Sequence, residues 1–167
     1  MKEKKAILII SAQYLPHLGG VENYVDNMAN TLSTKGHEVV VLTSTKDETC
    51  SFDQKKFNVY RLSSVGLLKG RFPLFIKDAK YYRICKELNS YNFDAVVINI
   101  RFYPLSLWGA RYAVKRGLRP IAGPLSIGSN RINNSIIHLG EGYFTRRIIR
   151  TNPVFSSVSL SAKNWLK

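Results

Sequence analysis

Two adjacent glycines, Gly19 and Gly20, are the residues whose type and position best suit ligand chemistry. They follow Pro16 and directly precede a stretch with helical periodicity, and an apolar run, Ala6–Ile10, lies before the loop. Glycines let the backbone approach a ligand closely, and the first amides of a helix are free to donate to a phosphate or another oxygen acceptor. A tight turn would use the same residues, so the loop Gln13–Gly20 alone leaves both interpretations open.

Several charged or polar side chains lie where a ligand at this loop could meet them. His17, within the loop, could contact a hydroxyl or a phosphate, although a solvent-facing histidine is the more ordinary interpretation. Glu22 falls in the first turn of the expected helix, where a carboxylate also balances the positive end of the helix dipole. Arg101 and Tyr103 follow an apolar run further along the chain, and Arg101 could bind an anion or face solvent. His37 precedes a buried run, and a histidine there most often bonds neighbouring backbone.

These residues need a scaffold, which the alternation of apolar runs and amphipathic stretches predicts. Ala6–Ile10 is apolar throughout, as expected of a strand covered on both faces in a parallel sheet. The stretch after the glycines carries its apolar residues on one helical face, and Gly36 stands where a left-handed residue would end that helix. This alternation predicts a doubly wound α/β domain with a mostly parallel sheet and helices on both faces. The other expected elements are strands at Glu38–Thr43, Asn58–Ser63, Asp94–Asn99, Pro120–Gly123 and Val154–Ser159 and a helix at Pro104–Lys115 stopped by Gly117.

Other segments give weaker patterns. Glycines and a proline predict a loop over Leu67–Phe75, with a helix over Leu74–Leu88. Ile132–Ile149 predicts nothing beyond a loop with one or two helical turns. Ala162–Leu166 has the pattern of a helix whose first turns end the sequence. We therefore expect residues 1–167 to be a single domain taken from a longer protein.

Composition excludes several protein classes. The sequence has 167 residues, 45% hydrophobic and 22% charged, which is ordinary for one globular domain. No apolar run approaches the roughly 20 residues of a bilayer-spanning helix, and the apolar run after the basic Met1–Lys5 is too short for a signal peptide. Cys50 and Cys85 lack metal-ligand spacing, so free thiols in a reducing compartment are expected. No dinucleotide or Walker A motif follows the first strand. We therefore expect a cytoplasmic protein.

The unusual property is the charge. The sequence has 25 Lys+Arg against 11 Asp+Glu, a net charge of +14, which attracts nucleic acid, anionic lipid or phosphorylated substrates. The segment Lys69–Lys86 interleaves basic and aromatic residues, which suits an anionic membrane surface at the inner face of the plasma membrane and equally suits a sheet-covering helix with a solvated basic face. A second basic cluster is formed by Arg146, Arg147 and Arg150. The candidate membrane residues are Lys69, Arg71, Phe72, Phe75, Lys77, Lys80 and Arg83.

The order of the motifs narrows these alternatives. P-x-x-G-G-x-E (Pro16–Glu22), an amphipathic helix and K-G-H-E-V (Lys35–Val39) together resemble the N-terminal domain of the GT4 family of retaining glycosyltransferases. The resemblance is strong over residues 6–44. It continues more loosely through F-D-A-V-V-I-N (Phe93–Asn99), R-P-I-A-G (Arg119–Gly123) and V-S-L-S-A (Val158–Ala162). Members have the GT-B architecture of two Rossmann-like domains facing each other across a cleft, so the resemblance implies a Rossmann-like N-terminal half.

The resemblance implies transfer of a sugar from a nucleotide-sugar to an acceptor, with retention and without a metal or other cofactor. The N-terminal domain would hold the acceptor glycan or glycolipid, and the Gly19-Gly20 loop would also approach the donor phosphates. The protein's own C-terminal domain, absent from this sequence, would hold most of the nucleotide. Many members have a histidine-glycine pair after the fifth strand, and here Ile127 stands in place of that histidine. The expected acceptor contacts are His17, Glu22, Arg101, Tyr103, Ser126, Gly128 and Ser129, and no residue is identified as catalytic.

Three functions stay open from the sequence. The first is the acceptor-binding domain of a GT4-like transferase. The second is a non-catalytic half that docks a separate catalytic subunit. The third, a basic nucleic-acid-binding module, is disfavoured because it would need stacking aromatics on an exposed sheet, whereas these strands are apolar throughout. The donor sugar, the acceptor and the linkage cannot be read from the sequence.

Overall fold

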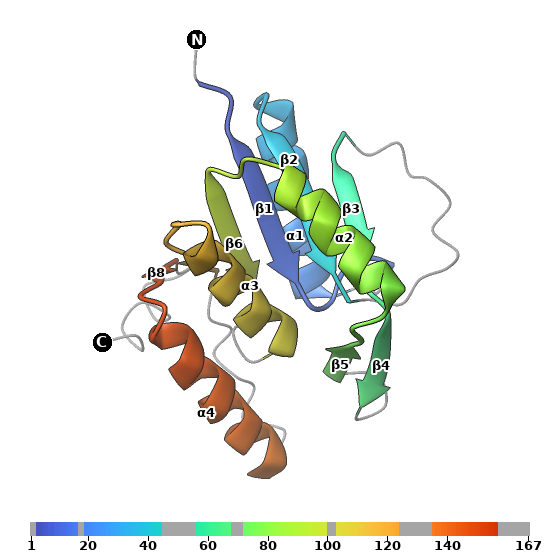
Figure 1. Cartoon of the computed structure of the whole chain (residues 1–167), viewed down its shortest axis with the longest axis vertical. Helices are drawn as coiled ribbons and strands as arrows, with labels where there is room; N and C mark the ends of the chain where they lie inside the picture. Colours follow the sequence, from blue (N-terminus) through green and yellow to red (C-terminus); the bar gives the residue numbers. More distant parts are fainter. Residues whose placement is uncertain are drawn as a thin grey trace.

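The fold is built on one parallel sheet. The computed structural model describes residues 3–16, 19–44, 56–67, 72–99, 103–123 and 135–156, and for residues 135–141 only the backbone is considered. Within these residues six parallel strands are arranged in the order β3-β2-β1-β6-β7-β8 (Figure 1). The strand order changes direction at β1, which makes the sheet doubly wound. The strands are β1 (Ala6–Ser11), β2 (Glu38–Thr43), β3 (Asn58–Arg61), β6 (Ala95–Asn99), β7 (Ile121–Ala122) and β8 (Val154–Phe155).

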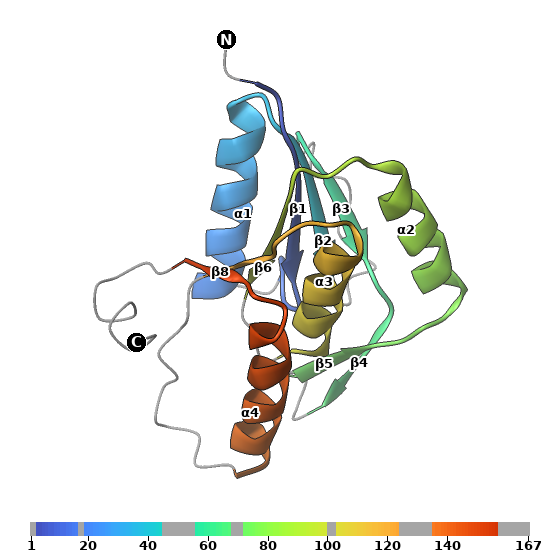
Figure 2. The ribbon, with the colours of Figure 1, turned by 60° about the vertical axis from the view of Figure 1, so that its left-hand side comes forward.

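Helices cover both faces of the sheet. Figure 2 shows α1 (Gly20–Thr34) on one side, and α2 (Ala79–Ser90) and α3 (Pro104–Lys115) on the other, with α4 (Ser135–Ile149) next to α3. The pleat of β1 explains this layering, because successive side chains point to opposite faces. Ile7 and Ile9 pack with Val25 and Ala29 of α1, whereas the alternate residues of β1 belong to the larger core beneath α2 and α3. The predicted two-sided burial is confirmed.

Most predicted elements are confirmed. The strand Glu38–Thr43 and the helix Pro104–Lys115 have their predicted bounds. Gly36 and Gly117 end the preceding helices with φ of 88° and 71°, in the left-handed region that glycine adopts without strain. The strand β1 extends one residue beyond the predicted Ala6–Ile10, and the remaining predicted strands are shorter than predicted. The segments Ser157–Ser159 and Ala162–Leu166 lie outside the described residues.

The predicted loop over Leu67–Phe75 and the helix from Leu74 are wrong. The chain forms an antiparallel hairpin of β4 (Ser64–Leu67) and β5 (Phe72–Phe75), in which Pro73 lies opposite Gly66. Both strands of a two-stranded ribbon are edges, so a proline without an N–H group is tolerated there. The helix α2 begins only at Ala79, because the side chain of Asp78 accepts a hydrogen bond from the backbone N–H of Tyr81 at 2.8 Å.

The segment Ile132–Ile149, which predicts no clear element, contains the four-turn helix α4. Gly140 and Gly142 weaken its helical pattern. Tertiary packing compensates, because Ile148 is fully buried in the larger core and Phe144 packs against it.

Several elements meet at one edge of the sheet. Parallel strands share a direction, so their carboxyl ends lie together, and the helices α1 and α3 begin at this carboxyl edge (Figure 1). The hairpin β4–β5 and most of α4 extend beyond the same edge. In doubly wound sheets, ligands bind at the carboxyl edge where the strand order changes direction. Here that point lies between β1 and β6.

Candidate functional site

Four polar residues form a row along the carboxyl edge. The register of the sheet places Arg61, Thr43, Ser11 and Asn99 side by side, and each is the last residue of its strand. We call them the polar row. Each lies two positions after a residue of the α1-facing apolar cluster, so the row continues that face of the sheet. Ser11, Thr43 and Asn99 are at most 2% exposed.

The two hydroxyl-bearing members of the row hold the loop between β1 and α1. Ser11 Oγ donates to the carbonyl of Gln13 at 2.6 Å. Thr43 Oγ1 and Ser44 Oγ both donate to the carbonyl of Ala12, at 3.5 and 2.9 Å. The start of the glycine loop is therefore tied to two neighbouring strands, which fixes the path of the chain toward Gly19.

The other two members each keep a nitrogen without a partner. Within the part of the chain that the structure describes, Asn99 Nδ2 and one guanidinium nitrogen of Arg61, Nη1, are buried and have no hydrogen-bond partner. The guanidinium carbon of Arg61 lies 5.7 Å from the centre of the Tyr14 ring. An unsatisfied buried donor costs about 1–3 kcal/mol and is uncommon in native proteins. Both nitrogens therefore lack the hydrogen-bond acceptor that a buried donor normally has.

The glycine loop combines two different roles. Gly19, the residue before α1, has extended backbone with φ −162° and ψ 171°, so it is not there for a left-handed conformation. A Cβ on Gly19 would lie 3.2 Å from Cδ of Glu22 and nearer still to Oε2, whereas a Cβ on Gly20 would meet nothing within 4 Å. Contact with the Glu22 side chain therefore explains why position 19 is a glycine. No described neighbour explains why position 20 is one. Within the described residues no side chain caps α1, so its first amides are open to a ligand.

Glu22 and Tyr103 bring the starts of α1 and α3 together. Glu22 is 7% exposed, and Tyr103, the residue before α3, is 4% exposed. Burial, and next the nearby charge of Glu22, raise the pKa of Tyr103 to about 12. The Tyr103 ring also packs on that of Phe72 at a centroid distance of 5.3 Å. The hairpin thus packs against the start of α3 at the carboxyl edge, where α1 also begins.

The predicted site residues divide into two groups. The structure brings together Gly19, Gly20, Glu22 and Tyr103 at one end of the sheet. Outside the described residues lie His17, Lys69, Arg71, Arg101, Ser126, Ile127, Gly128 and Ser129. The sequence interpretation missed Arg61 and Asn99. Asn99 had a signal, because it is a polar residue at the end of the predicted strand Asp94–Asn99. Arg61 had none, because it lies inside the predicted strand Asn58–Ser63.

The candidate membrane residues also divide. Phe72 and Phe75 are half-buried and pack against the larger core, and Phe75 stacks on Tyr81 at 5.9 Å. Lys77, Lys80 and Arg83 are exposed. Exposed apolar side chains occur on the hairpin, on α2 and on the connection between them. They are Val65, Leu67, Ile76 and Tyr82. In the part of the chain that the structure describes, no helix is long and apolar enough to cross a membrane.

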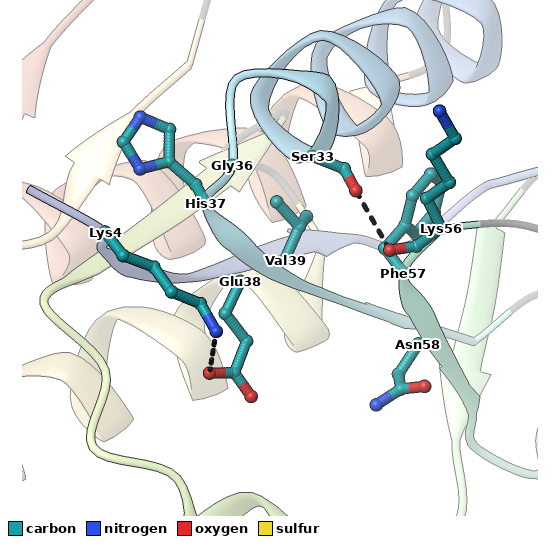
Figure 3. A pocket seen from close by; sticks show the side chains of 9 residues that line it. All are labelled: Lys4, Ser33, Gly36, His37, Glu38, Val39, Lys56, Phe57 and Asn58. Carbon is teal, nitrogen blue, oxygen red and sulfur yellow. Dashed lines mark hydrogen bonds and ion pairs between the residues drawn. The ribbon is translucent and has the colours of Figure 1, made fainter. Parts of the chain in front are cut away.

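An open pocket of about 580 Å³ lies at the opposite, amino edge of the sheet (Figure 3). Several of its polar groups have partners. His37 Nδ1 accepts from the backbone N–H of Lys5 at 3.2 Å, which confirms the backbone role predicted for this histidine. Ser33 Oγ donates to the carbonyl of Lys56 at 2.9 Å, and the ammonium group of Lys4 lies 3.8 Å from Glu38. The residues lining the pocket are Lys4, Ser33, Gly36, His37, Glu38, Val39, Lys56, Phe57 and Asn58.

Metal-binding side chains do not gather in the described ranges. Among those residues there is no group of three or more histidine, cysteine, aspartate or glutamate side chains that could hold a metal ion. Cys85 is a free thiol, and burial raises its pKa. Cys50 lies outside the described residues.

Comparison with known proteins agrees with the fold. The sequence profile of Glycosyltransferase Family 4 matches residues 18–166. The chain is also 26% identical over 116 residues to MJ1069, an uncharacterized glycosyltransferase of Methanocaldococcus jannaschii. That match covers 68% of this chain and 30% of the relative, so the chain spans less than a third of the relative's length. Because the family profile covers most of the sequence and the sheet is a doubly wound, Rossmann-like one, the chain belongs to glycosyltransferase family 4.

Proposed function

We propose that this chain is the acceptor-side domain of a retaining glycosyltransferase. It moves a sugar from a nucleotide-sugar to an acceptor, a glycan or a glycolipid, and needs no metal ion or other cofactor. The observation that supports this most is the meeting of two helix starts and the polar row beside β1 and β6. Family membership supplies the class of reaction.

The carboxyl edge offers two kinds of contact to such substrates. The first amides of α1 and its positive dipole end suit the donor phosphates, and Gly20 leaves the space above them open. The carboxylate of Glu22 and the polar groups near it suit hydroxyl groups, because a carboxylate accepts hydrogen bonds from them. We propose that the donor phosphates lie over Gly20 and that the acceptor lies toward Glu22 and Tyr103.

Binding of the donor nucleotide needs a second protein surface opposite the carboxyl edge. We propose that a second Rossmann-like domain supplies it, either on the same polypeptide or as a separate catalytic subunit. The 30% coverage of the relative is compatible with either arrangement. The two are distinguished by the length of the encoded protein and by whether it transfers sugar without a further subunit.

A transfer assay on the full-length protein tests the proposal. Wild-type protein is given a panel of nucleotide-sugars, and the released nucleoside diphosphate is measured with and without candidate acceptors. We expect Gly20→Val to lower kcat/KM by about 100-fold or more, because its side chain would fill the space proposed for the donor phosphates. This is the size of effect seen when one key backbone donor is lost. The melting temperature should not change. Gly142→Val in α4, whose added side chain also meets open space, is the control and keeps full activity.

Two results would count against the proposal. Wild-type protein that turns over none of the donors, alone or with its partner domain, would reject the transferase function. Full activity of Gly20→Val would instead show that Gly19-Gly20 is only a turn.

We also propose that the protein docks on an anionic membrane through the hairpin and α2. The exposed side chains Val65, Leu67, Ile76 and Tyr82 supply apolar contact. Around them the exposed cations Lys77, Lys80, Arg83 and Lys86 match acidic headgroups. The half-buried Phe72 and Phe75 hold this surface on the core rather than entering lipid.

Sedimentation with vesicles tests this surface. Binding to vesicles containing anionic phospholipid should exceed binding to neutral vesicles, and Lys80→Glu/Arg83→Glu should abolish the difference. The matched control is Arg111→Glu/Lys115→Glu on α3, which makes the same change of charge at exposed positions. Equal, negligible binding of the wild type to both vesicles would reject the proposal.

A further inference from the structure

Asn99 is the buried polar group that the fold leaves least explained. It ends β6 beside Ser11 of β1, at the point where the strand order changes direction, and it is 2% exposed. Its side-chain nitrogen has no partner. The hydroxyl of Ser106 donates to the main-chain carbonyl of Asn99 at 3.5 Å. A donor kept unpaired in this position implies a partner that binds from outside the fold.

Gly123 fixes where the Asn99 side chain lies. The backbone N–H of Gly123 donates to the carbonyl of Ile98 at 2.6 Å, which brings the end of β7 against Asn99. A Cβ on Gly123 would lie 3.2 Å from Asn99 Oδ1 and 3.1 Å from the Ile98 carbonyl, tighter than ordinary packing. The glycine therefore lets the chain close over the amide. Asn99 is held in place before any ligand arrives.

The surroundings of Asn99 favour a hydroxyl over a phosphate. Asn99 lies on the α1-facing side of the sheet, at the carboxyl edge, and Glu22 is in the first turn of α1, which begins at the same edge. A hydroxyl group can accept a hydrogen bond from an amide and donate its own proton to a carboxylate. A phosphate diester offers no proton to Glu22. An amide donor and a carboxylate acceptor on neighbouring elements therefore suit a sugar or polyol.

We propose that Asn99 Nδ2 donates a hydrogen bond to a hydroxyl oxygen of the acceptor, which makes Asn99 a positioning and specificity-determining residue of the acceptor site. This rests on the proposed transferase function. Asn99 fixes the hydroxyl-bearing substrate against the α1-facing edge, while the donor phosphates lie over Gly20.

The first test needs no substrate. Asn99→Leu replaces the amide by an apolar side chain of similar shape and removes the unpaired donor. The melting temperature should stay equal or rise, because an unpaired buried donor destabilises the folded state. A fall of several degrees would show that the amide is held by the fold and would overturn the proposal. This result stands whether or not the transferase function is correct.

The second test measures both Michaelis constants of the full-length protein. Asn99→Leu and the isosteric Asn99→Asp both remove the donor, and each should raise the acceptor KM about 10-fold, the effect of one lost hydrogen bond, with the donor KM unchanged. Asn92→Leu, at an exposed asparagine before β6, is the matched control and should change neither. A rise in the donor KM alone, or no change in either, would overturn the assignment. Absence of any transfer by wild-type protein would reject the transferase function instead.

Discussion

The two edges of the sheet differ in how their polar groups are satisfied. At the amino edge lies an open pocket of about 580 Å³, and several of its polar side chains have partners: His37 accepts from the backbone of Lys5, and Ser33 donates to the backbone of Lys56. At the carboxyl edge, Asn99 and Arg61 each keep a buried nitrogen without a partner. A hollow shows only that space is present, whereas unpaired buried donors show that a partner is missing. The difference supports our proposal that the substrates bind at the carboxyl edge.

The direction of α1 strengthens this contrast. The helix begins at the carboxyl edge with uncapped amides and ends next to the amino-edge pocket at Gly36. Its positive dipole end therefore faces the proposed substrates, and its negative end faces the exposed cations Lys4 and Lys56. Cations near a helix carboxyl end stabilise the fold. We therefore expect variants at the amino edge to change stability and variants at the carboxyl edge to change activity.

A pair of glycine substitutions gives the largest expected difference between the edges. Gly19→Ala places a methyl group against the Glu22 carboxylate and displaces it, so kcat/KM should fall about 10-fold or more with little change in stability. Gly36→Ala forces alanine to a φ of 88° and should lower the free energy of unfolding by about 1 kcal/mol, with kcat/KM unchanged. Transfer kinetics and urea unfolding of both variants measure this. Two variants with the same profile would remove the distinction between the edges.

The burial of Tyr103 predicts a pH dependence that belongs to the carboxyl edge. Its pKa of about 12 in the folded protein exceeds the ordinary value of 10.0, first through burial and then through Glu22. The folded state therefore keeps a proton that the unfolded state loses between pH 10 and 12. This contribution to stability is complete below pH 10 and is lost as the pH rises through 12.

Urea unfolding at several pH values measures this contribution. By pH 11 the wild type should lose about 1.4 kcal/mol more than Tyr103→Phe does, because phenylalanine has no proton to lose. Other tyrosines, including Tyr60, whose pKa burial also raises, titrate alike in both proteins and cancel in the comparison. Parallel pH profiles for the two proteins would contradict the burial of the Tyr103 hydroxyl beside Glu22.

Local sequence patterns predicted much of this fold, because neighbouring residues along the chain largely determine many of its strands and helices. The apolar run Val39–Leu42 predicts the strand Glu38–Thr43, and Gly117 predicts the end of the helix Pro104–Lys115, without reference to distant residues. The hairpin β4–β5 was not predicted, because its glycine and proline are typical of a loop. Only the pairing of Gly66 with Pro73 shows that they belong to strands. Pairing between strands is a tertiary property, and it overrides local propensity.

The candidate site shows the same limit. Gly19, Gly20 and Glu22 belong to one short motif, so sequence order already places them together. Arg61 and Asn99 are 38 positions apart and become members of one row only through the register of four strands. Whether their nitrogens are paired depends on every neighbour in space. No spacing rule along the chain contains that information.

The smallest expected effect is at the amino edge, in the ion pair of Lys4 and Glu38. Their charged groups lie 3.8 Å apart, and both side chains are largely exposed, at 69% and 47%. Water and salt screen such a pair, so a double-mutant cycle with Lys4→Met and Glu38→Gln should give a coupling energy below about 0.5 kcal/mol, smaller still in 1 M salt. Transfer kinetics should not change in any of the three variants. A fall in kcat/KM caused by Lys4→Met would place a substrate at the amino edge, and the pairing of polar groups would then no longer separate a structural edge from a functional one.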